Sequence, residues 1–376
     1  MRIAFYAPLK APDHPVPSGD RQMARLLLAT LRAGGHQVEM ASTFRSFLPK
    51  PDPMQMREVE ARAEDEAARL IASYDADGPP DLWFCYHHYY KAPDLLGPRL
   101  ATHFGLPMAM AEASHAGKRA DGPWAGWHRI NEAALRGADL QICFTPRDAE
   151  GLEGVAPADR ILMLPPFIDA GPFVNLHRST LYPGRVELVT VAMMRAGDKV
   201  RSYAFLAEAL ADLPSRLDWR LTIVGDGPER RSVEGCFARL LGERIVWAGE
   251  QDADGVAAAM AGADLYVWPG FGEAYGVAYL EAAAAGLPSL AMDCGGISSV
   301  VTDGVTGVLT PEGDGPAFTA AVERLVMNAS LRQRLGVEAR RVATQERTVK
   351  RAAMLLSKAL AGLQRHPSIS HQASNI

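Results

Sequence analysis

The sequence predicts an α/β protein made of two Rossmann-like domains that face each other across a cleft. Short β-rich runs alternate with longer helical stretches, which is typical of parallel sheets covered by helices. The 376 residues exceed the usual length of one domain. The alternation also starts afresh after residues 167–184, a stretch that has no sustained period and contains Gly, Pro and Asn.

These observations set the expected domain boundaries. We expect an N-terminal domain over residues 1–167, a linker over 168–184 and a C-terminal domain over 185–363. The polar tail 364–376 is expected to be disordered. Ligands of open parallel sheets bind beyond the carboxyl ends of the strands, so the chemistry is expected in the cleft.

The first half begins with a strand at Ile3–Ala7 and a helix from Gly19 to about Ala33, which Gly34 and Gly35 end. A charged helix is expected at about 54–73, where the mixture of Arg and Glu indicates a solvated face. The other β-rich runs of this half are Gln37–Ala41, Asp81–Tyr86, Pro107–Glu112, Asp139–Phe144 and Arg160–Leu164.

The second half repeats the pattern, with a helical segment after each strand. Its predicted strands are Val186–Ala192, Trp219–Val224, Arg244–Ala248, Asp264–Trp268 and Pro288–Met292. Three helices are expected to finish the fold, at about Pro316–Met327, Ser330–Glu338 and Thr348–Leu363.

Composition excludes several classes of protein. Hydrophobic residues make up 48 % and charged residues 22 %, and the net charge of −5 gives no sign of nucleic-acid binding. Met1–Tyr6 runs straight into a strand, so we expect no signal peptide, and no apolar run is long enough for a transmembrane helix. The scattered cysteines favour buried free thiols in a reducing cytoplasm; they are Cys85, Cys143, Cys236 and Cys294.

The most informative segment is Trp268–Pro311. A strand ends at its start, and a Gly-containing loop leads to a helix that begins near Gly276. The first amides of a helix lack internal partners and lie at the positive end of its dipole. Tyr275, Gly276 and Val277 can therefore offer N–H groups to a phosphate.

Two carboxylates flank this phosphate site. Glu273 lies in the loop and Glu281 lies inside the helix, with seven residues between them. Carboxylates accept hydrogen bonds from hydroxyls, so the pair suits the sugar and ribose of a sugar nucleotide. The alternative is that Glu281 is a helix-surface residue and Glu273 a partner of the helix dipole.

The wider pattern resembles a known family. The Glu273…Glu281 spacing is followed by Ala285–Pro288, Gly295–Gly296 and Asp303-Gly304-x-x-Gly307. Order and spacing over some 40 residues resemble the C-terminal domain of family 4 glycosyltransferases, which have the GT-B fold. The resemblance implies that Glu273 approaches the donor sugar and that Glu281 contacts the ribose.

Weaker agreement covers most of the chain. The turn Val224–Pro228 fits the family and makes Gly225 a donor-binding residue. Lys199 matches the family's phosphate-clamping Lys. The family's usual Arg position falls on Met193, so either Arg195 substitutes for it through a rearranged loop or the clamp relies on Lys199.

The first domain is expected to supply the acceptor site. Gly19 resembles the glycine of the family's first loop, which approaches the donor phosphate, while Ser18 or Asp20 as a helix N-cap is the competing role. The family often carries a His near the transferred sugar at the position of His115, although a lone His is more often structural.

The run after the strand Asp81–Tyr86 is a candidate acceptor-recognition loop. His88, Tyr90 and Lys91 could stack on a sugar or meet an anionic group. No metal is expected, because Asp252–Asp254 is better read as a helix cap and Asp75–Asp77 as part of a Gly-Pro turn.

The resemblance implies a hexosyltransferase that moves a sugar from a UDP- or GDP-sugar to a hydroxyl acceptor with retention of anomeric configuration. It implies no cofactor beyond the nucleotide-sugar co-substrate and the option of peripheral membrane contact, while the cysteines favour a cytoplasmic location. Glycan, glycolipid and small-molecule glycoside synthesis all remain open. The alternatives are a sugar-nucleotide epimerase or hydrolase of the same fold, and a non-catalytic sugar-nucleotide-binding protein.

Overall fold

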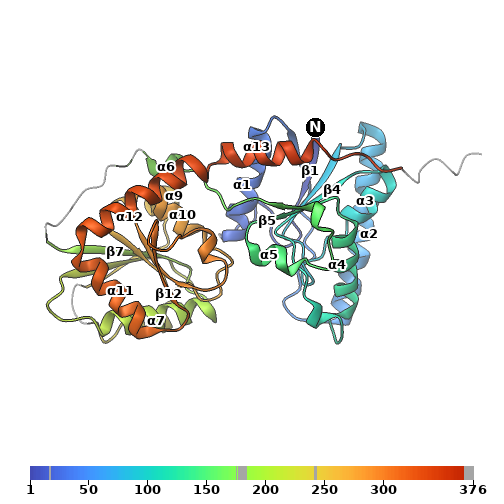
Figure 1. The fold of residues 1–376 in the computed structure, drawn as a ribbon. Helices are drawn as coiled ribbons and strands as arrows, with labels where there is room; N and C mark the ends of the chain where they lie inside the picture. The colour runs from blue at the N-terminus through green and yellow to red at the C-terminus, as the bar shows by residue number, and fades with distance from the viewer. Residues whose placement is uncertain (17, 175, 177–183, 241–243, 368–376) are drawn as a thin grey trace, which may run out of the picture. The chain divides into compact units, whose positions relative to one another are not determined.

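The computed structural model describes residues 1–16, 18–174, 176, 184–240 and 244–367 (Figure 1). The chain divides into two compact units, and each is described by itself. Unit 1 comprises Met1–Pro165 and the chain from Val349 onward, and unit 2 comprises Pro166–Thr348. The expected linker 168–184 and tail 364–376 fall partly on residues 175, 177–183 and 368–376, which lie outside the described residues.

Unit 1 contains a six-stranded sheet of order β2-β1-β3-β4-β5-β6 in which every neighbouring pair is parallel. All five residues of β3 are buried, as expected for a strand covered on both faces. The strands are β1 (Arg2–Tyr6), β2 (Gln37–Ser42), β3 (Leu82–Tyr86), β4 (Met108–Ala111), β5 (Leu140–Cys143) and β6 (Ile161–Met163).

Helices cover this sheet and bury an aromatic core that includes Trp83 and Trp127. They are α1 (Gly19–Ala33), α2 (Pro53–Asp77), α3 (Gly97–Phe104), η1 (Gly117–Arg119), α4 (Ala125–Gly137), α5 (Pro146–Gly151), η2 (Ala158–Arg160) and α13 (Val349–Leu360). The charged helix α2 exposes its Arg/Glu face as predicted, but its opposite face packs into the core. Asp75–Asp77 form its last turn rather than a Gly-Pro turn, which corrects the prediction.

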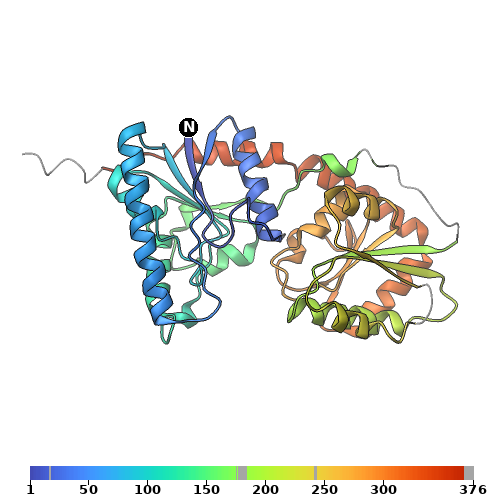
Figure 2. The same ribbon diagram turned by 180° about the vertical axis from the view of Figure 1, so that it is seen from behind.

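The last helix belongs to the first unit, whereas the sequence placed residues 348–363 in the C-terminal domain. Figures 1 and 2 show α13 beside α1 in both views. The His36 ring and Ser357 Oγ are 3.0 Å apart. A Cβ on Gly34 would lie 2.3 Å from the same Oγ, so the end of α1 needs a glycine here. The amphipathic pattern of α13 specified a buried face but not the sheet that it covers.

Unit 2 also contains a six-stranded parallel sheet, of order β12-β11-β10-β7-β8-β9. The sequence analysis did not predict β12, which begins at Gly307 in the glycine-rich motif. The strands are β7 (Val186–Val191), β8 (Trp219–Val224), β9 (Ile245–Gly249), β10 (Leu265–Val267), β11 (Ser289–Asp293) and β12 (Gly307–Pro311).

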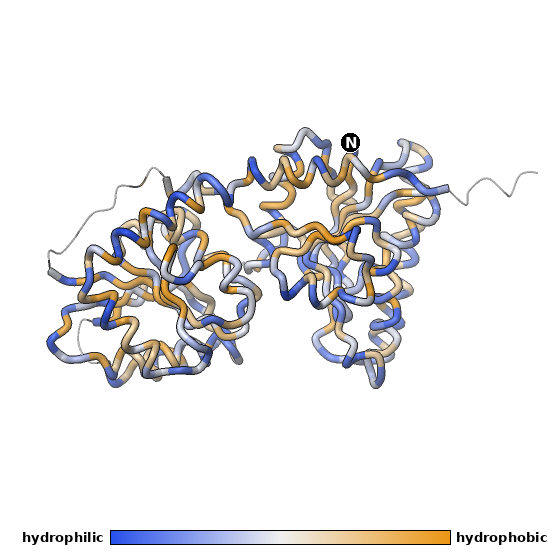
Figure 3. Tube along the Cα trace, in the orientation of Figure 1, coloured by the Kyte–Doolittle hydropathy of each residue, from blue (hydrophilic) through white to orange (hydrophobic). Residues whose placement is uncertain are grey.

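The helices of unit 2 follow its strands in alternation, and Figure 3 shows the apolar residues concentrated along the sheets. Among the described residues, no helix of either unit is long and apolar enough to cross a bilayer. The helices of unit 2 are α6 (Gly171–Val174), α7 (Asp198–Ala211), α8 (Arg230–Cys236), α9 (Ala253–Ala261), α10 (Val277–Ala284), η3 (Ile297–Ser299), α11 (Gly315–Met327), α12 (Ala329–Arg341) and η4 (Val342–Glu346).

The strand orders fix where each unit can bind a ligand. In unit 2 the chain runs outward from β7 to β9 on one side and from β10 to β12 on the other, so the order switches between β7 and β10. In unit 1 the switch lies between β1 and β3. Loops that leave the carboxyl ends of two such strands diverge and leave a crevice, where ligands of parallel sheets bind.

Candidate active site

The switch point of unit 2 brings together two residues that lie 74 positions apart in the sequence. Lys199 is at the start of α7 after β7, and Glu273 lies in the loop after β10. The Lys199 ammonium donates a hydrogen bond to Oε1 of Glu273. Their side chains are 30 % and 16 % exposed, so the pair is partly accessible to a ligand. The structure thus joins two of the four residues that the sequence assigned to catalysis.

Trp268 holds this pair in position. Its indole N–H donates to the same Glu273 Oε1 at 2.9 Å, and the Lys199 ammonium lies 5.5 Å from its ring centroid. The ring is 1 % exposed, so its orientation is set by the core beneath the site. The indole N–H and the ammonium therefore both donate to one carboxylate oxygen, which orients Glu273.

Close backbone packing shapes the loop that carries Glu273. Gly295 has φ +59°, and a Cβ there would lie 2.2 Å from the Glu273 carbonyl oxygen. Gly272 has φ +66°, and a Cβ there would lie 2.3 Å from a carboxylate oxygen of Asp198. Glycine is required at both positions for two reasons: φ is positive, and a Cβ would collide with a neighbouring oxygen.

The N-terminus of α10 lies directly after this loop. Gly276 is its N-cap with φ +78°, and no side chain caps the helix. A Cβ on Gly276 would lie 2.6 Å from the Tyr279 ring, so the backbone passes close over that ring. The amides of Gly276 and Val277 begin the helix as the sequence predicted, whereas the side chain of Tyr275 is buried. An anion at this end would meet backbone N–H groups and the positive end of the dipole.

Glu281 lies one turn further along α10 and is partly buried. The effect of its charge is seen at Tyr266, a core residue of β10. The pKa of Tyr266 is raised well above its ordinary value, first by burial and then by the negative charges of Glu273 and Glu281. The two glutamates therefore face one region of unit 2, as the E-x7-E spacing predicts.

Arg195 and Gly225 are two other residues of unit 2 that the sequence predicted for the site. Arg195 is exposed and forms no hydrogen bond or ion pair with another described residue. Gly225 has φ +137°, and a Cβ there would lie 2.0 Å from the Ala192 carbonyl oxygen. The glycine is thus required where the β8–α8 loop meets the β7–α7 loop, and its donor-binding role stays a prediction.

Unit 1 has a corresponding contact across its own switch point. Ser18 caps α1 by accepting from the Arg21 amide at 3.2 Å, so Ser18 and not Asp20 is the predicted N-cap. A Cβ on Gly19 would meet nothing within 4 Å, so its role at a phosphate is untested. Asp20, in the first turn of α1, lies 3.2 Å from the His87 ring after β3.

Two residues are central to this second cluster: Glu112, which the sequence analysis missed, and His87, which it included in the candidate acceptor loop without choosing it as a site residue. They are the two non-glycine residues with positive φ among those described, at +61° and +53°. Each directly follows an apolar strand, and that position was the available signal. A left-handed backbone is unusual for a residue other than glycine, and such strain often marks functional sites.

The cluster perturbs the pKa of all three groups. Burial raises the pKa of Glu112 to about 7, against the opposing effects of His87 and of the hydrogen bond that Tyr86 donates at 2.9 Å. Burial acts to lower the pKa of His87, but the Asp20 hydrogen bond and the Glu112 charge outweigh it and the net pKa is raised. The pKa of Asp20 is lowered, because His87 outweighs its burial.

The predicted acceptor loop needs one correction. His88 is fully buried: its Nδ1 accepts from the Asp94 amide at 2.7 Å, and its Nε2 lies 3.2 Å from the Asn131 carbonyl oxygen. A ring with both nitrogens engaged in the core cannot bind an acceptor, so His88 is structural. Tyr90 and Lys91 are partly exposed, and their ammonium-to-ring distance is 6.0 Å.

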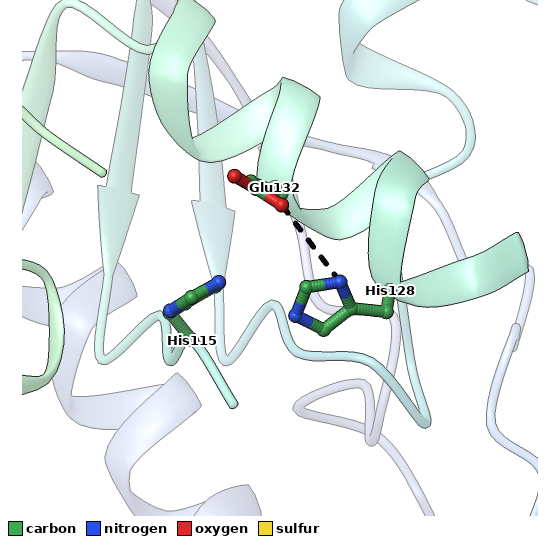
Figure 4. A group of neighbouring side chains, drawn as sticks. All are labelled: His115, His128 and Glu132. Atoms are coloured by element: carbon green, nitrogen blue, oxygen red, sulfur yellow. Dashed lines mark ion pairs between the residues drawn. The ribbon is translucent and has the colours of Figure 1, made fainter. Parts of the chain in front are cut away.

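His115 follows β4 as predicted, and it lies beside two residues of α4 (Figure 4). Its ring centroid is 5.0 Å from that of His128, and Glu132 lies next to both. Burial lowers the pKa of His115, and the neighbouring His128 lowers it further. The ring is therefore neutral at neutral pH.

Comparisons with known proteins agree with this architecture. Residues 185–328 match the family described as "Glycosyl transferases group 1". The chain is 42 % identical over 357 residues to phosphatidyl-myo-inositol mannosyltransferase of Mycobacterium leprae, covering 89 % of this chain and 90 % of that protein. Sucrose-phosphate synthase from Thermosynechococcus elongatus has a similar structure, with TM-score 0.74, 20 % identity and coverage of 96 % and 98 %. Anabaena HepE in complex with UDP and glucose gives TM-score 0.70 at 16 % identity, with coverage of 96 % and 100 %.

The two parallel-sheet units, which resemble those of these solved structures, define the GT-B fold. The chain belongs to family 4 of the glycosyltransferases and is a hexosyltransferase-type glycosyltransferase of glycolipid or glycan synthesis.

Proposed function

We propose that the chain transfers a hexose from a UDP- or GDP-sugar to a hydroxyl acceptor, with retention of the anomeric configuration and without a metal. The observation that carries this proposal is the Lys199–Glu273 contact at the unit 2 switch point, next to the uncapped start of α10. A cation, a carboxylate and free helix amides in one place match the charges and hydroxyls of a sugar nucleotide.

The donor is proposed to bind to unit 2. Its diphosphate accepts hydrogen bonds from the amides of Gly276 and Val277 and draws Lys199 away from Glu273. Glu273, still oriented by Trp268, then accepts from hydroxyls of the sugar, and Glu281 accepts from the ribose. The structural similarity to a protein solved with UDP and glucose supports a donor of this class.

The transfer step breaks the bond between the anomeric carbon and the phosphate oxygen, and the acceptor oxygen forms the new bond from the same face. The departing phosphate takes the acceptor's proton, so charge and atoms balance without an enzyme carboxylate as nucleophile. Lys199 and the α10 amides stabilise the negative charge that develops on the phosphate. Arg195 is exposed at the end of the same β7 loop and is proposed as a second, weaker cation for it.

The acceptor is proposed to bind to unit 1. Asp20, His87 and Glu112 supply acceptors and a donor for several neighbouring hydroxyls. His115 is proposed to lie near the transferred sugar, and Tyr90 with Lys91 at the rim of the acceptor site. The similar mycobacterial protein is a phosphatidyl-myo-inositol mannosyltransferase, which makes an inositol-bearing lipid the first acceptor to test. Such a substrate would require peripheral membrane contact.

The cytoplasm is the proposed compartment. The four described cysteines are free, and three of them are buried, which suits a reducing environment.

The first test is a calorimetric panel of nucleotide diphosphates and their sugars, with and without EDTA, on the wild type and on Glu281→Ala. Binding of one nucleotide that ignores EDTA and weakens about tenfold in the variant supports the proposal, as expected for loss of a charged hydrogen bond. If no nucleotide binds, or if binding requires a metal and ignores Glu281, the proposal is wrong. Turnover of donor without acceptor would favour the epimerase or hydrolase alternative, and binding without turnover the non-catalytic one.

A further inference from the structure

Three side chains that can ligate a metal converge in unit 1. His115 comes from the loop after β4, while His128 and Glu132 come from α4 (Figure 4). One ligand atom from each residue lies within 4.8 Å of the other two. Spacing of i, i+4 places His128 and Glu132 on one face of the helix. It is the one group of this kind among the described parts of the chain.

The two imidazoles have buried nitrogens without partners. The Nε2 atoms of His115 and His128 are both buried, and neither atom forms a hydrogen bond. The His128 side chain is 2 % exposed. Buried polar atoms are normally paired, and each exception calls for a water, an ion or a functional reason. His88, in the same unit, shows the ordinary case, because both of its nitrogens have backbone partners.

The backbone around the three residues is already fixed. Asn131 Nδ2 donates to the Ser114 carbonyl oxygen at 3.1 Å, which ties the loop of His115 to α4. Arg136 pairs with Oε1 of Glu132, whereas Oε2 lies 3.8 Å from Nδ1 of His128. One carboxylate oxygen is thus oriented by an arginine and the other faces the imidazoles. A ligand carboxylate held by an outer hydrogen-bonding partner is the usual arrangement in metal sites.

We propose that His115, His128 and Glu132 form a binding site for a borderline-soft divalent cation, with Zn²⁺ as the fitting ion. Two imidazoles and one carboxylate are the three protein ligands of many open zinc sites, in which a fourth position remains for solvent. Tetrahedral coordination at about 2.0–2.2 Å requires ligand atoms about 3.3 Å apart. The ligand atoms therefore need to approach one another by up to about 1.5 Å, which rotation about the χ angles supplies.

The lowered pKa of His115 is consistent with this site, because a metal binds the neutral imidazole. Occupancy would also have a consequence for activity. The ion would hold the His115 ring that the proposed function places near the transferred sugar, so Zn²⁺ is expected to inhibit transfer reversibly. This consequence rests on the proposed function, whereas the binding site does not.

The binding test uses the full, untagged chain after EDTA treatment and removal of the chelator. Zn²⁺ is titrated in competition with a chromophoric chelator, and one ion per chain is expected. His115→Gln, His128→Gln and Glu132→Gln should each weaken the affinity about tenfold or more. His103→Gln is the matched control, since His103 lies 3.9 Å from a single carboxylate in the same unit and should retain wild-type affinity. Thermal melting without metal checks each fold, and the partly exposed Glu132 keeps the test decisive if a buried His variant does not fold.

Stoichiometric zinc binding that all three variants weaken and the control retains supports the site. Absence of stoichiometric binding, or equal affinity in Glu132→Gln and the wild type, overturns it. Transfer assays with and without Zn²⁺ then test the consequence. Binding without inhibition leaves the metal site standing and contradicts the placement of His115 beside the sugar, so the two proposals fail separately.

Discussion

Replacing Glu112 by Gln tests the charged cluster at the switch point of unit 1. The ordinary pKa of this carboxyl is 4.5, and burial raises the pKa to about 7 in the folded chain. Between these two pH values the folded chain binds more protons than the unfolded chain. The free energy of unfolding therefore falls as the pH rises from 4.5 to 7, and the full difference corresponds to about 3 kcal/mol.

Gln stays neutral at every pH and still accepts the Tyr86 hydroxyl through its amide oxygen. The difference between variant and wild type should be small near pH 5, where Glu112 of the folded chain is protonated and the unfolded chain has only begun to lose this proton. Near pH 8 the free energy of unfolding of the variant should be higher than that of the wild type by about 1–3 kcal/mol. The lower values apply because Glu112 is partly exposed and because the variant loses the attraction between Glu112 and His87.

The measurement is urea unfolding at pH 5 and pH 8, followed by circular dichroism. Glu150→Gln is the matched control, because Glu150 is exposed in the same unit and its replacement should change stability little at either pH. If Glu112→Gln shifts the free energy of unfolding equally at both pH values, burial does not control this carboxyl and the reasoning is refuted.

Three further predictions concern unit 2. Lys199→Met should weaken binding of a nucleoside diphosphate by about tenfold or more in calorimetry, because it removes the cation at the switch point, and unchanged affinity would contradict the phosphate role. Gly295→Ala should lower the free energy of unfolding by about 2 kcal/mol or more through strain and collision with the Glu273 carbonyl. Gly313→Ala is the control, because Gly313 has φ +75° and open space around it, and it should cost only about 1 kcal/mol of strain. If both variants lose the same free energy of unfolding, the collision at Gly295 is excluded. Trp268→Phe should remove one buried hydrogen bond and cost about 1 kcal/mol while lowering activity more than stability, and full activity in a transfer assay would show that the indole does not orient Glu273.

Sequence patterns that act over short distances predicted most of the fold. The helix Gly19–Ala33 and the strand Trp219–Val224 were predicted to the residue, since periodicity, a cap and glycine breaks are all local signals. The E-x7-E spacing predicted that Glu273 and Glu281 share a region, because loop and helix are continuous there. The Lys199 role stays a prediction, but its motif placed it at the correct strand end.

The sequence could not choose between His87 and His88. Two adjacent histidines after one strand look alike in a pattern. Only the structure shows that His87 lies beside Asp20 while the next residue, His88, is buried in the core. Glu112 was missed for the same reason, because neither its positive φ nor its burial is visible in residue types.

By itself the sequence determined two α/β units, their strand and helix order and the family, since these depend on local periodicity and motif spacing. Tertiary structure alone decided which strands flank each switch point, that α13 covers the first sheet, and which charged groups meet. The contacts Lys199–Glu273 and Asp20–His87 join residues 74 and 67 positions apart, and His115 meets α4 only through loop packing. Such contacts depend on strand order and side-chain direction, which residue spacing along the chain does not specify.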